Sequence, residues 1–153
     1  MKKFGTLTFG LLAALVLAGC SGGAETSPDP QAVFSALEEQ VALPELVDMT
    51  DEYLEMGLGI DPNSWDSAVC YLPVDGTQPD EIIMVRATDS DKADDIRSKL
   101  EDRLGYKEKS AQLYLTENMP VIEAGVVRQD GLTVSLIVSE QAEEICGVLD
   151  SMS

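Results

Sequence analysis

The sequence predicts an α+β domain with two layers, in which a small antiparallel sheet of three to four strands has helices packed mainly on one face. Three observations predict this class. Residues 129–131 read Gln-Asp-Gly between two apolar runs, and Asp-Gly is a strong β-hairpin signal. Residues 82–85 are consecutive and apolar, as in a central strand. Residues 89–104 have the spacing of a long helix, which permits a crossover between strands.

The domain is predicted to begin with a helix over about residues 30–40. Asp29 is an N-cap acid, and Pro30 occupies the first helical position, where proline is favoured. The apolar residues that follow lie at helical spacing: Val33, Phe34, Leu37 and Val41. Pro44 stops this helix, and a short second helix is predicted over 51–56.

Two strands and a long helix come next. Residues 65–72 are predicted to form a strand that a turn at 75–76 closes, and 81–87 form the clearest strand. A helix then begins after Asp89 and is expected to end at Gly105, because glycine commonly terminates helices. Residues 107–115 are expected to add one or two further helical turns.

The last third is predicted to be a hairpin followed by a helix. Residues 122–128 and 132–138 form the two arms. The second arm alternates, so one face should pack on a core while the other is partly polar. Residues 142–152 have the apolar spacing of an amphipathic C-terminal helix.

Composition and charge exclude several functional classes. The chain of 153 residues has 10 lysine and arginine against 28 aspartate and glutamate residues, a formal net charge of -18, and no histidine. This balance excludes the cationic surface that nucleic-acid binding needs. Without histidine, Ser-His-Asp and Cys-His catalysis and histidine zinc sites are excluded.

No catalytic, cofactor or metal site is predicted from the motifs. The sequence has no GxSxG and no SxxK motif, so no serine nucleophile has a recognisable base. Residues 61–72 and 89–100 begin like calcium-binding loops. Both lack the glycine that such a loop needs at its sixth position, so we interpret them as turns and helix caps.

The N-terminal residues resemble the signal and lipobox of bacterial lipoproteins. Residues 1–3 read Met-Lys-Lys, and residues 4–18 carry no charge. That uncharged run is shorter than the ~20 residues of a membrane-spanning helix. The lipobox pattern itself comprises Leu17, Ala18, Gly19 and Cys20. By this resemblance, a diacylglycerol is attached to the Cys20 thiol and the signal peptide is removed before it.

We therefore divide the chain into three parts. Residues 1–19 are a signal peptide, residues 20–29 are a flexible tether that starts at lipidated Cys20, and residues 30–153 are a single α+β domain. Loss of both signal lysines changes the net charge from -18 to -20. The expected location is the extracytoplasmic face of the cell membrane, where two acyl chains hold the protein.

Cys70 and Cys146 are the cysteines that remain after Cys20 is lipidated. Cys70 falls in the first predicted strand and Cys146 on the apolar side of the last helix, so a disulfide between them is one interpretation. The other interpretation is two thiols packed as small apolar residues. The sequence leaves both open.

Several segments together resemble a known family. They are residues 81–87, the charged helix 91–104, Tyr114, and residues 125–139. Their order is similar to that of Gram-positive lipoproteins known as domain of unknown function 4358, over about residues 54–145. The resemblance implies a lipid-anchored extracytoplasmic protein, encoded beside envelope O-acyltransferase systems. It implies no catalytic or binding residues.

Three functional hypotheses follow. The first is a non-catalytic binding or accessory module that docks on another cell-envelope protein, with the membrane and that protein as partners. The second is a lipoprotein that binds a cationic solute or a metal ion, because the chain is strongly acidic. The third is an envelope hydrolase that uses paired carboxylates.

Overall fold

The computed structural model describes residues 27–153. The predicted signal peptide and lipobox, including Cys20, lie outside the described residues. The five strands are β1 (Leu46–Asp48), β2 (Trp65–Pro73), β3 (Glu81–Ala87), β4 (Val126–Asp130) and β5 (Thr133–Val138). The longer helices are α1 (Pro30–Gln40), α3 (Ser90–Tyr114), α4 (Met119–Glu123) and α5 (Ala142–Met152). The short helical segments are α2 (Thr50–Glu52), η1 (Tyr53–Gly57), η2 (Pro62–Ser64) and η3 (Thr116–Asn118).

The strands form one antiparallel sheet in the order β1-β2-β3-β5-β4, so the predicted α+β class is confirmed. The sheet has five strands rather than three to four. The added strand is β1, which pairs with the end of β2. Because β1 has only three residues, its sequence shows no period that could have predicted it.

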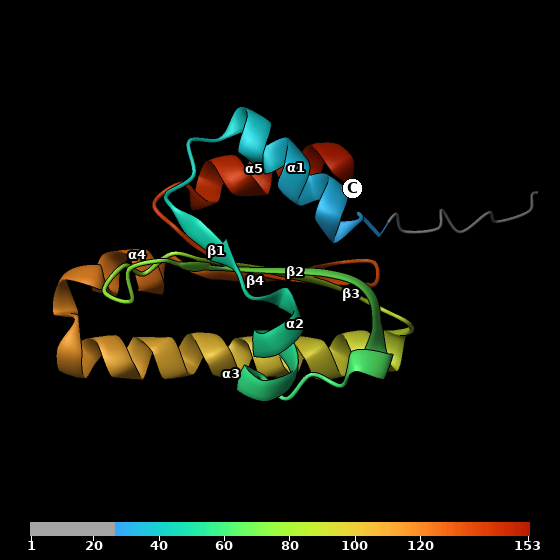
Figure 1. The fold of residues 1–153 in the computed structure, drawn as a ribbon, viewed down its shortest axis with the longest axis horizontal. Coiled ribbons are helices and arrows are strands. Elements are labelled where there is room, and N and C mark those ends of the chain that lie inside the picture. The colour runs from blue at the N-terminus through green and yellow to red at the C-terminus, as the bar shows by residue number, and fades with distance from the viewer. Residues whose placement is uncertain (1–26) are drawn as a thin grey trace, which may run out of the picture.

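Helices cover both faces of the sheet, so the predicted packing on mainly one face is wrong. Figure 1 shows α1 and α5 on one side and α2 and α3 on the other. The reason lies in β3, where Ile82 and Met84 belong to the core under α1 and α5. Ile83 and Val85 belong to the core against α3. A strand that is apolar on both faces has to be covered on both.

The helix α3 extends to Tyr114, so the predicted end at Gly105 is wrong. Gly105 has no positive φ, and the helix continues through it. Ala111 is buried further along, which extends the apolar side past the glycine. The predicted strand 122–128 is also wrong in its first half, because α4 occupies 119–123 and β4 begins at Val126.

The predicted hairpin is confirmed in β4 and β5, where Asp130 pairs with Thr133 and Gly131 takes a φ of 59°. Its polar side is buried, since Thr133 and Ser135 are 0% exposed. These residues lie on the side of the sheet that α1 and α5 cover. The alternation of apolar and polar residues in β5 therefore separates two buried faces, not a buried face from a solvent-exposed one.

Residues 27–29 belong to the fold, whereas the sequence placed them in the tether. The Leu132 backbone N–H donates to Ser27 Oγ at 2.8 Å, and Thr133 Oγ1 donates to the Pro28 carbonyl at 2.7 Å. Ser67 Oγ donates to the Asp29 carboxylate. These bonds satisfy polar groups of the sheet and hold the start of the described chain against it. The contact lies at the end of the sheet where α3 begins (Figure 1).

Candidate functional site

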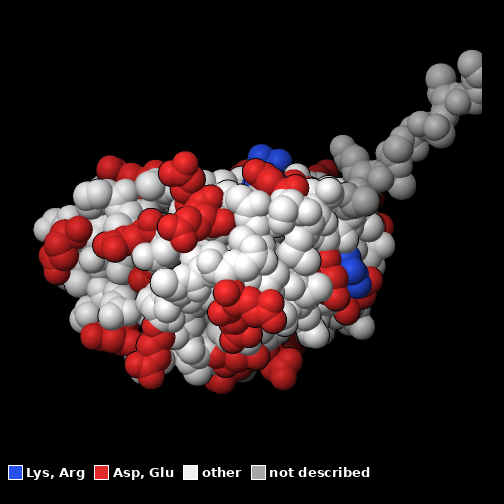
Figure 2. All heavy atoms as spheres, turned by 90° about the horizontal axis from the view of Figure 1, so that it is seen from above, with Lys and Arg blue, Asp and Glu red and all other residues white. Residues whose placement is uncertain are grey.

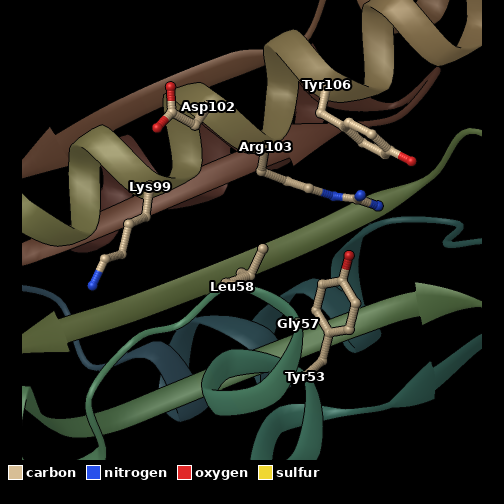
Figure 3. Close-up of a pocket in the computed structure, with 7 residues that line it drawn as sticks. All are labelled: Tyr53, Gly57, Leu58, Lys99, Asp102, Arg103 and Tyr106. Atoms are coloured by element: carbon tan, nitrogen blue, oxygen red, sulfur yellow. The ribbon is translucent and has the colours of Figure 1, made fainter.

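A pocket of about 500 Å³ lies between η1 and α3 (Figure 3). Its size is within the range of small-molecule sites. It is lined by Tyr53, Gly57, Leu58, Lys99, Asp102, Arg103 and Tyr106. The floor comes from a short turn before β2 and the wall from the middle of α3, so the fold brings together segments that are distant in sequence.

The wide helical turn η1 positions the first tyrosine. The Leu58 N–H donates to the Tyr53 carbonyl at 3.0 Å, five residues back, which is the π-helical pattern. A Cβ atom on Gly57 would lie 2.6 Å from the Tyr53 ring, so only glycine leaves the ring in this place. Gly59 follows with a φ of 64° and turns the chain away.

Glu81 organises the basic side chains behind the pocket. Its side chain is 1% exposed at the start of the central strand β3. Arg103 donates to both carboxylate oxygens, with Nε–Oε1 at 2.9 Å and Nη2–Oε2 at 3.0 Å. Lys107 Nζ donates to Oε2 at 3.0 Å. One buried carboxylate therefore holds two cations that are four residues apart on α3.

Two tyrosine rings flank the guanidinium of Arg103. Its Cζ lies 5.5 Å from the centre of the Tyr53 ring and 5.9 Å from the centre of the Tyr106 ring. Burial raises the pKa of the Tyr53 hydroxyl, and the charge of Arg103 offsets part of that rise. Burial lowers the pKa of Arg103, but the hydrogen bonds and charge of Glu81 outweigh it, so the pKa is raised.

Lys99 and Asp102 also line the pocket, but neither is a free reactive group at its centre. Lys99 Nζ lies 2.8 Å from Asp95 Oδ2 and donates to the Gly59 carbonyl at 2.8 Å. Figure 3 shows the Asp102 carboxylate directed away from the Arg103 guanidinium. The arrangement is suited to holding a ligand by cationic and hydroxyl donors.

The helix that forms the pocket differs in charge from the rest of the protein. Six of the eight basic residues within 27–153 lie on α3: Lys92, Arg97, Lys99, Arg103, Lys107 and Lys109. Figure 2 looks onto the side that carries α1 and α5, where acidic side chains far outnumber basic ones. Because α3 also has six acidic residues, this helix carries no net charge.

Apolar side chains are also exposed on the two elements that form the pocket. Four of the six large apolar side chains that are exposed within 27–153 belong to η1 or α3: Met56, Tyr106, Leu113 and Tyr114. Their exposed fractions run from 64% to 82%. We call the surface formed by Tyr53, Met56, Arg103, Tyr106, Leu113 and Tyr114 the η1–α3 surface.

A second groove, of about 430 Å³, lies on the acidic part of the protein. Carboxylates of Glu38, Asp48 and Asp51 line it beside Phe34 and Tyr71. The two rings are stacked, with 3.6 Å between their centres and 6° between their planes. This groove is lined by carboxylates and no basic side chain, whereas the Arg103 pocket offers cationic donors.

The two cysteines that the sequence singled out lie on opposite faces of the sheet. Cys70 is buried in the core against α3, and Cys146 packs on the core under α1 and α5. Both are free thiols, so the disulfide is not formed and each thiol packs among apolar residues. Burial raises the pKa of Cys70 to about 12, which keeps this thiol protonated at neutral pH.

Residues 27–153 offer neither a metal cluster nor a membrane-spanning helix. They contain no group of three or more Cys, Asp or Glu side chains arranged to hold a metal ion. Within the same range, no helix is both long and apolar enough to span a membrane.

Sequence reasoning missed the Arg103 pocket, although signals for it were present. Glu81 stands directly before an apolar run that had to be buried, and a buried carboxylate needs a cationic partner. Arg103 and Lys107 are four residues apart, on the side of α3 that faces the sheet. What the sequence did not show is that η1 lies across α3.

Comparison with known proteins identifies one family. A family model described as domain of unknown function 4358 matches residues 39–139. The match includes all five strands, η1 and α3, and therefore the whole pocket. No curated protein and no solved structure matches the chain.

Proposed function

This chain belongs to the family of domain of unknown function 4358. Because the description of this family names no activity, we propose a function from the geometry of the chain's own site. The protein is a non-catalytic binding module, attached through diacylglyceryl-Cys20 to the extracytoplasmic face of the cell membrane. It docks on another envelope protein through the η1–α3 surface. Anchor and location rest on the lipobox pattern at residues 17–20.

The observation that carries the docking proposal is the composition of this surface. Tyrosine, methionine and arginine are enriched at protein interfaces, and tyrosine and arginine dominate their energetic centres. The η1–α3 surface brings together Tyr106, Tyr114, Met56 and Arg103, the tyrosines and the methionine well exposed. The other two exposed large apolar side chains within 27–153 are Val47 on β1 and Val74 just after β2.

The orientation of the domain supports the same surface. The described chain begins beside Leu132, at the end of the sheet where α3 starts. Since α3 has 25 residues, its far end is about 37 Å away at ~1.5 Å per residue. Leu113 and Tyr114 thus lie at the far end of α3 from Ser27, where the described chain begins.

Position-dependent crosslinking in cells that produce the protein tests the proposal. A photoreactive amino acid replaces Leu113 in one variant and Met56 in another, and Glu144 on α5 is the control position. We expect both test positions to capture the same membrane protein, identified by mass spectrometry, and the control to capture none of it. Capture at Glu144 instead, or at no position, contradicts the docking surface.

A second candidate function is the binding of a cationic solute in the groove beside Phe34 and Tyr71. The observation that favours it is the combination of stacked rings with Glu38 and Asp51, since carboxylates and aromatic faces both attract organic cations. Calorimetry with spermidine and with calcium tests it. Heat that disappears in the Glu38→Gln/Asp51→Asn variant supports this function, and no heat from either probe excludes it.

A further inference from the structure

We propose that the pocket between η1 and α3 is a binding site for an oxyanion, a carboxylate or phosphate group, held by Arg103 between Tyr53 and Tyr106. This inference names the ligand chemistry of the proposed docking surface. It rests on the proposed function because the pocket opens on the η1–α3 surface. The oxyanion belongs either to a small ligand or to the docked protein, and the chemistry that recognises it is the same.

The unused hydrogen-bond donors of Arg103 carry the argument. A guanidinium has five N–H donors, and two such groups side by side match the two oxygens of a carboxylate or phosphate. Glu81 occupies the edge formed by Nε and Nη2. The edge formed by Nη1 and Nη2 keeps a second parallel pair of N–H groups, for which residues 27–153 supply no partner.

The charge of the buried cluster formed by Glu81, Arg103 and Lys107 also favours an anion. Glu81 contributes one negative charge, whereas Arg103 and Lys107 contribute two positive charges, so the buried cluster has a net charge of one positive unit. These basic side chains are only 19% and 14% exposed, so water screens the excess charge poorly. A bound oxyanion would neutralise the cluster.

The donors are held in place before any ligand binds. Glu81 fixes the plane of the guanidinium by two hydrogen bonds, and the tyrosine rings cover it. The Gly57 backbone supports the Tyr53 ring from behind. A ligand therefore orders few side chains on binding, which lowers the entropic cost of association. The phenol hydroxyls of Tyr53 and Tyr106, which both line the pocket, are further donors.

Nuclear magnetic resonance of the full chain, labelled with nitrogen-15, tests the site with simple probes. Sodium acetate and inorganic phosphate are titrated separately, with sodium chloride at matched ionic strength as the blank. The Nε–Hε signal of Arg103 is the readout. Arg97 provides an internal control, because it lies on the same helix but pairs with Glu101 on the exposed side.

We expect saturable shifts at Arg103 with one or both oxyanions and no saturation at Arg97 or with chloride. Acetate alone indicates a carboxylate site, and phosphate alone a phosphate site. The variants Tyr53→Phe and Tyr106→Phe keep the rings but lose the hydroxyls. Each should raise the dissociation constant about tenfold or more, as expected for one hydrogen bond to a charged group.

Equal, non-saturating shifts at both arginines overturn the oxyanion site. That result leaves the docking surface standing if crosslinking at Leu113 still captures its partner, so the two failures are distinguishable. Saturable binding that is unchanged in both tyrosine variants also overturns the inference, because the anion then binds elsewhere on the cluster.

Discussion

Replacing Arg103 with methionine should destabilise the fold strongly, because it strands a buried carboxylate. Methionine keeps the apolar stem, so the change isolates the charge and its hydrogen bonds. Glu81 is 1% exposed and would retain only the Lys107 ammonium. Two charge-assisted hydrogen bonds at ~1.5–3 kcal/mol each, and the known cost of breaking a buried ion pair, both indicate a loss of about 4 kcal/mol.

Three control variants show how much of the lost unfolding free energy comes from the buried carboxylate. Lys107→Met removes one hydrogen bond to Glu81 and should cost about 2 kcal/mol. Arg97→Met breaks an exposed pair with Glu101, four residues away on the same helix, and should cost at most ~0.5 kcal/mol. The double variant Glu81→Met/Arg103→Met should lose less than the sum of its single changes, since no carboxylate is then left unpaired.

Urea unfolding, followed through the fluorescence of Trp65, the single tryptophan, measures these free energies. A total stability of ~5–15 kcal/mol is usual for a domain, so the Arg103→Met protein should still fold but unfold at much lower urea. If Arg103→Met and Arg97→Met lie within about 0.5 kcal/mol of one another, the reasoning about the Glu81 cluster is refuted.

Three further predictions concern the anchor, the buried thiol and the turn under the pocket. Cys20→Ala should move the protein from the membrane fraction to the soluble fraction and abolish labelling by radioactive palmitate; unchanged fractionation refutes the lipid anchor. Cys70 should resist thiol reagents in the folded protein at pH 8, whereas Cys146 reacts, as mass spectrometry of the modified peptides would show. Because the pKa of Cys70 is raised from 9.0 to about 12, its contribution to stability is full below pH 9 and is lost between pH 9 and 12; at pH 10 the loss should be on the order of 1 kcal/mol relative to Cys70→Ala. Gly57→Ala should displace the Tyr53 ring and cost about 1–3 kcal/mol in urea unfolding, whereas a cost near zero would show that the ring is free to move.

The elements that sequence predicted well are those whose local signals agree with one another. The helix at residues 30–40 has an N-cap acid, a proline at its first position and regular apolar spacing, and its bounds match the structure. The strand at 81–87 is apolar without interruption and also matches. In both segments, propensity and burial favour the same conformation.

The errors arise where tertiary contacts override a local signal. Gly105 is a helix terminator in isolation, but Leu104 and Ala111 pack against the core on either side of it and keep α3 continuous. The segment at 122–128 is apolar enough for a strand, yet Ile122 is buried as part of α4 against the same core. Periodicity alone does not separate short helices from strands.

The pocket was beyond sequence reasoning because its residues meet only in the folded chain. Glu81 and Arg103 are 22 positions apart in the sequence. Tyr53 stands 50 positions before Arg103, although its ring centre lies 5.5 Å from the guanidinium carbon. The sequence did show that these residue types were present. The approach of Tyr53 to Arg103 depends on η1 lying across α3, which no local sequence pattern encodes.

The affinity of the crosslinked membrane protein for variants of the η1–α3 surface tests the central claim most directly. With the purified partner, Tyr106→Ala and Leu113→Ser should each raise the dissociation constant about tenfold or more, as for buried interface residues. Val74→Ser removes an exposed apolar side chain from the β2–β3 loop and should change the dissociation constant less than about twofold. Equal effects of all three changes, or none, would contradict docking through this surface.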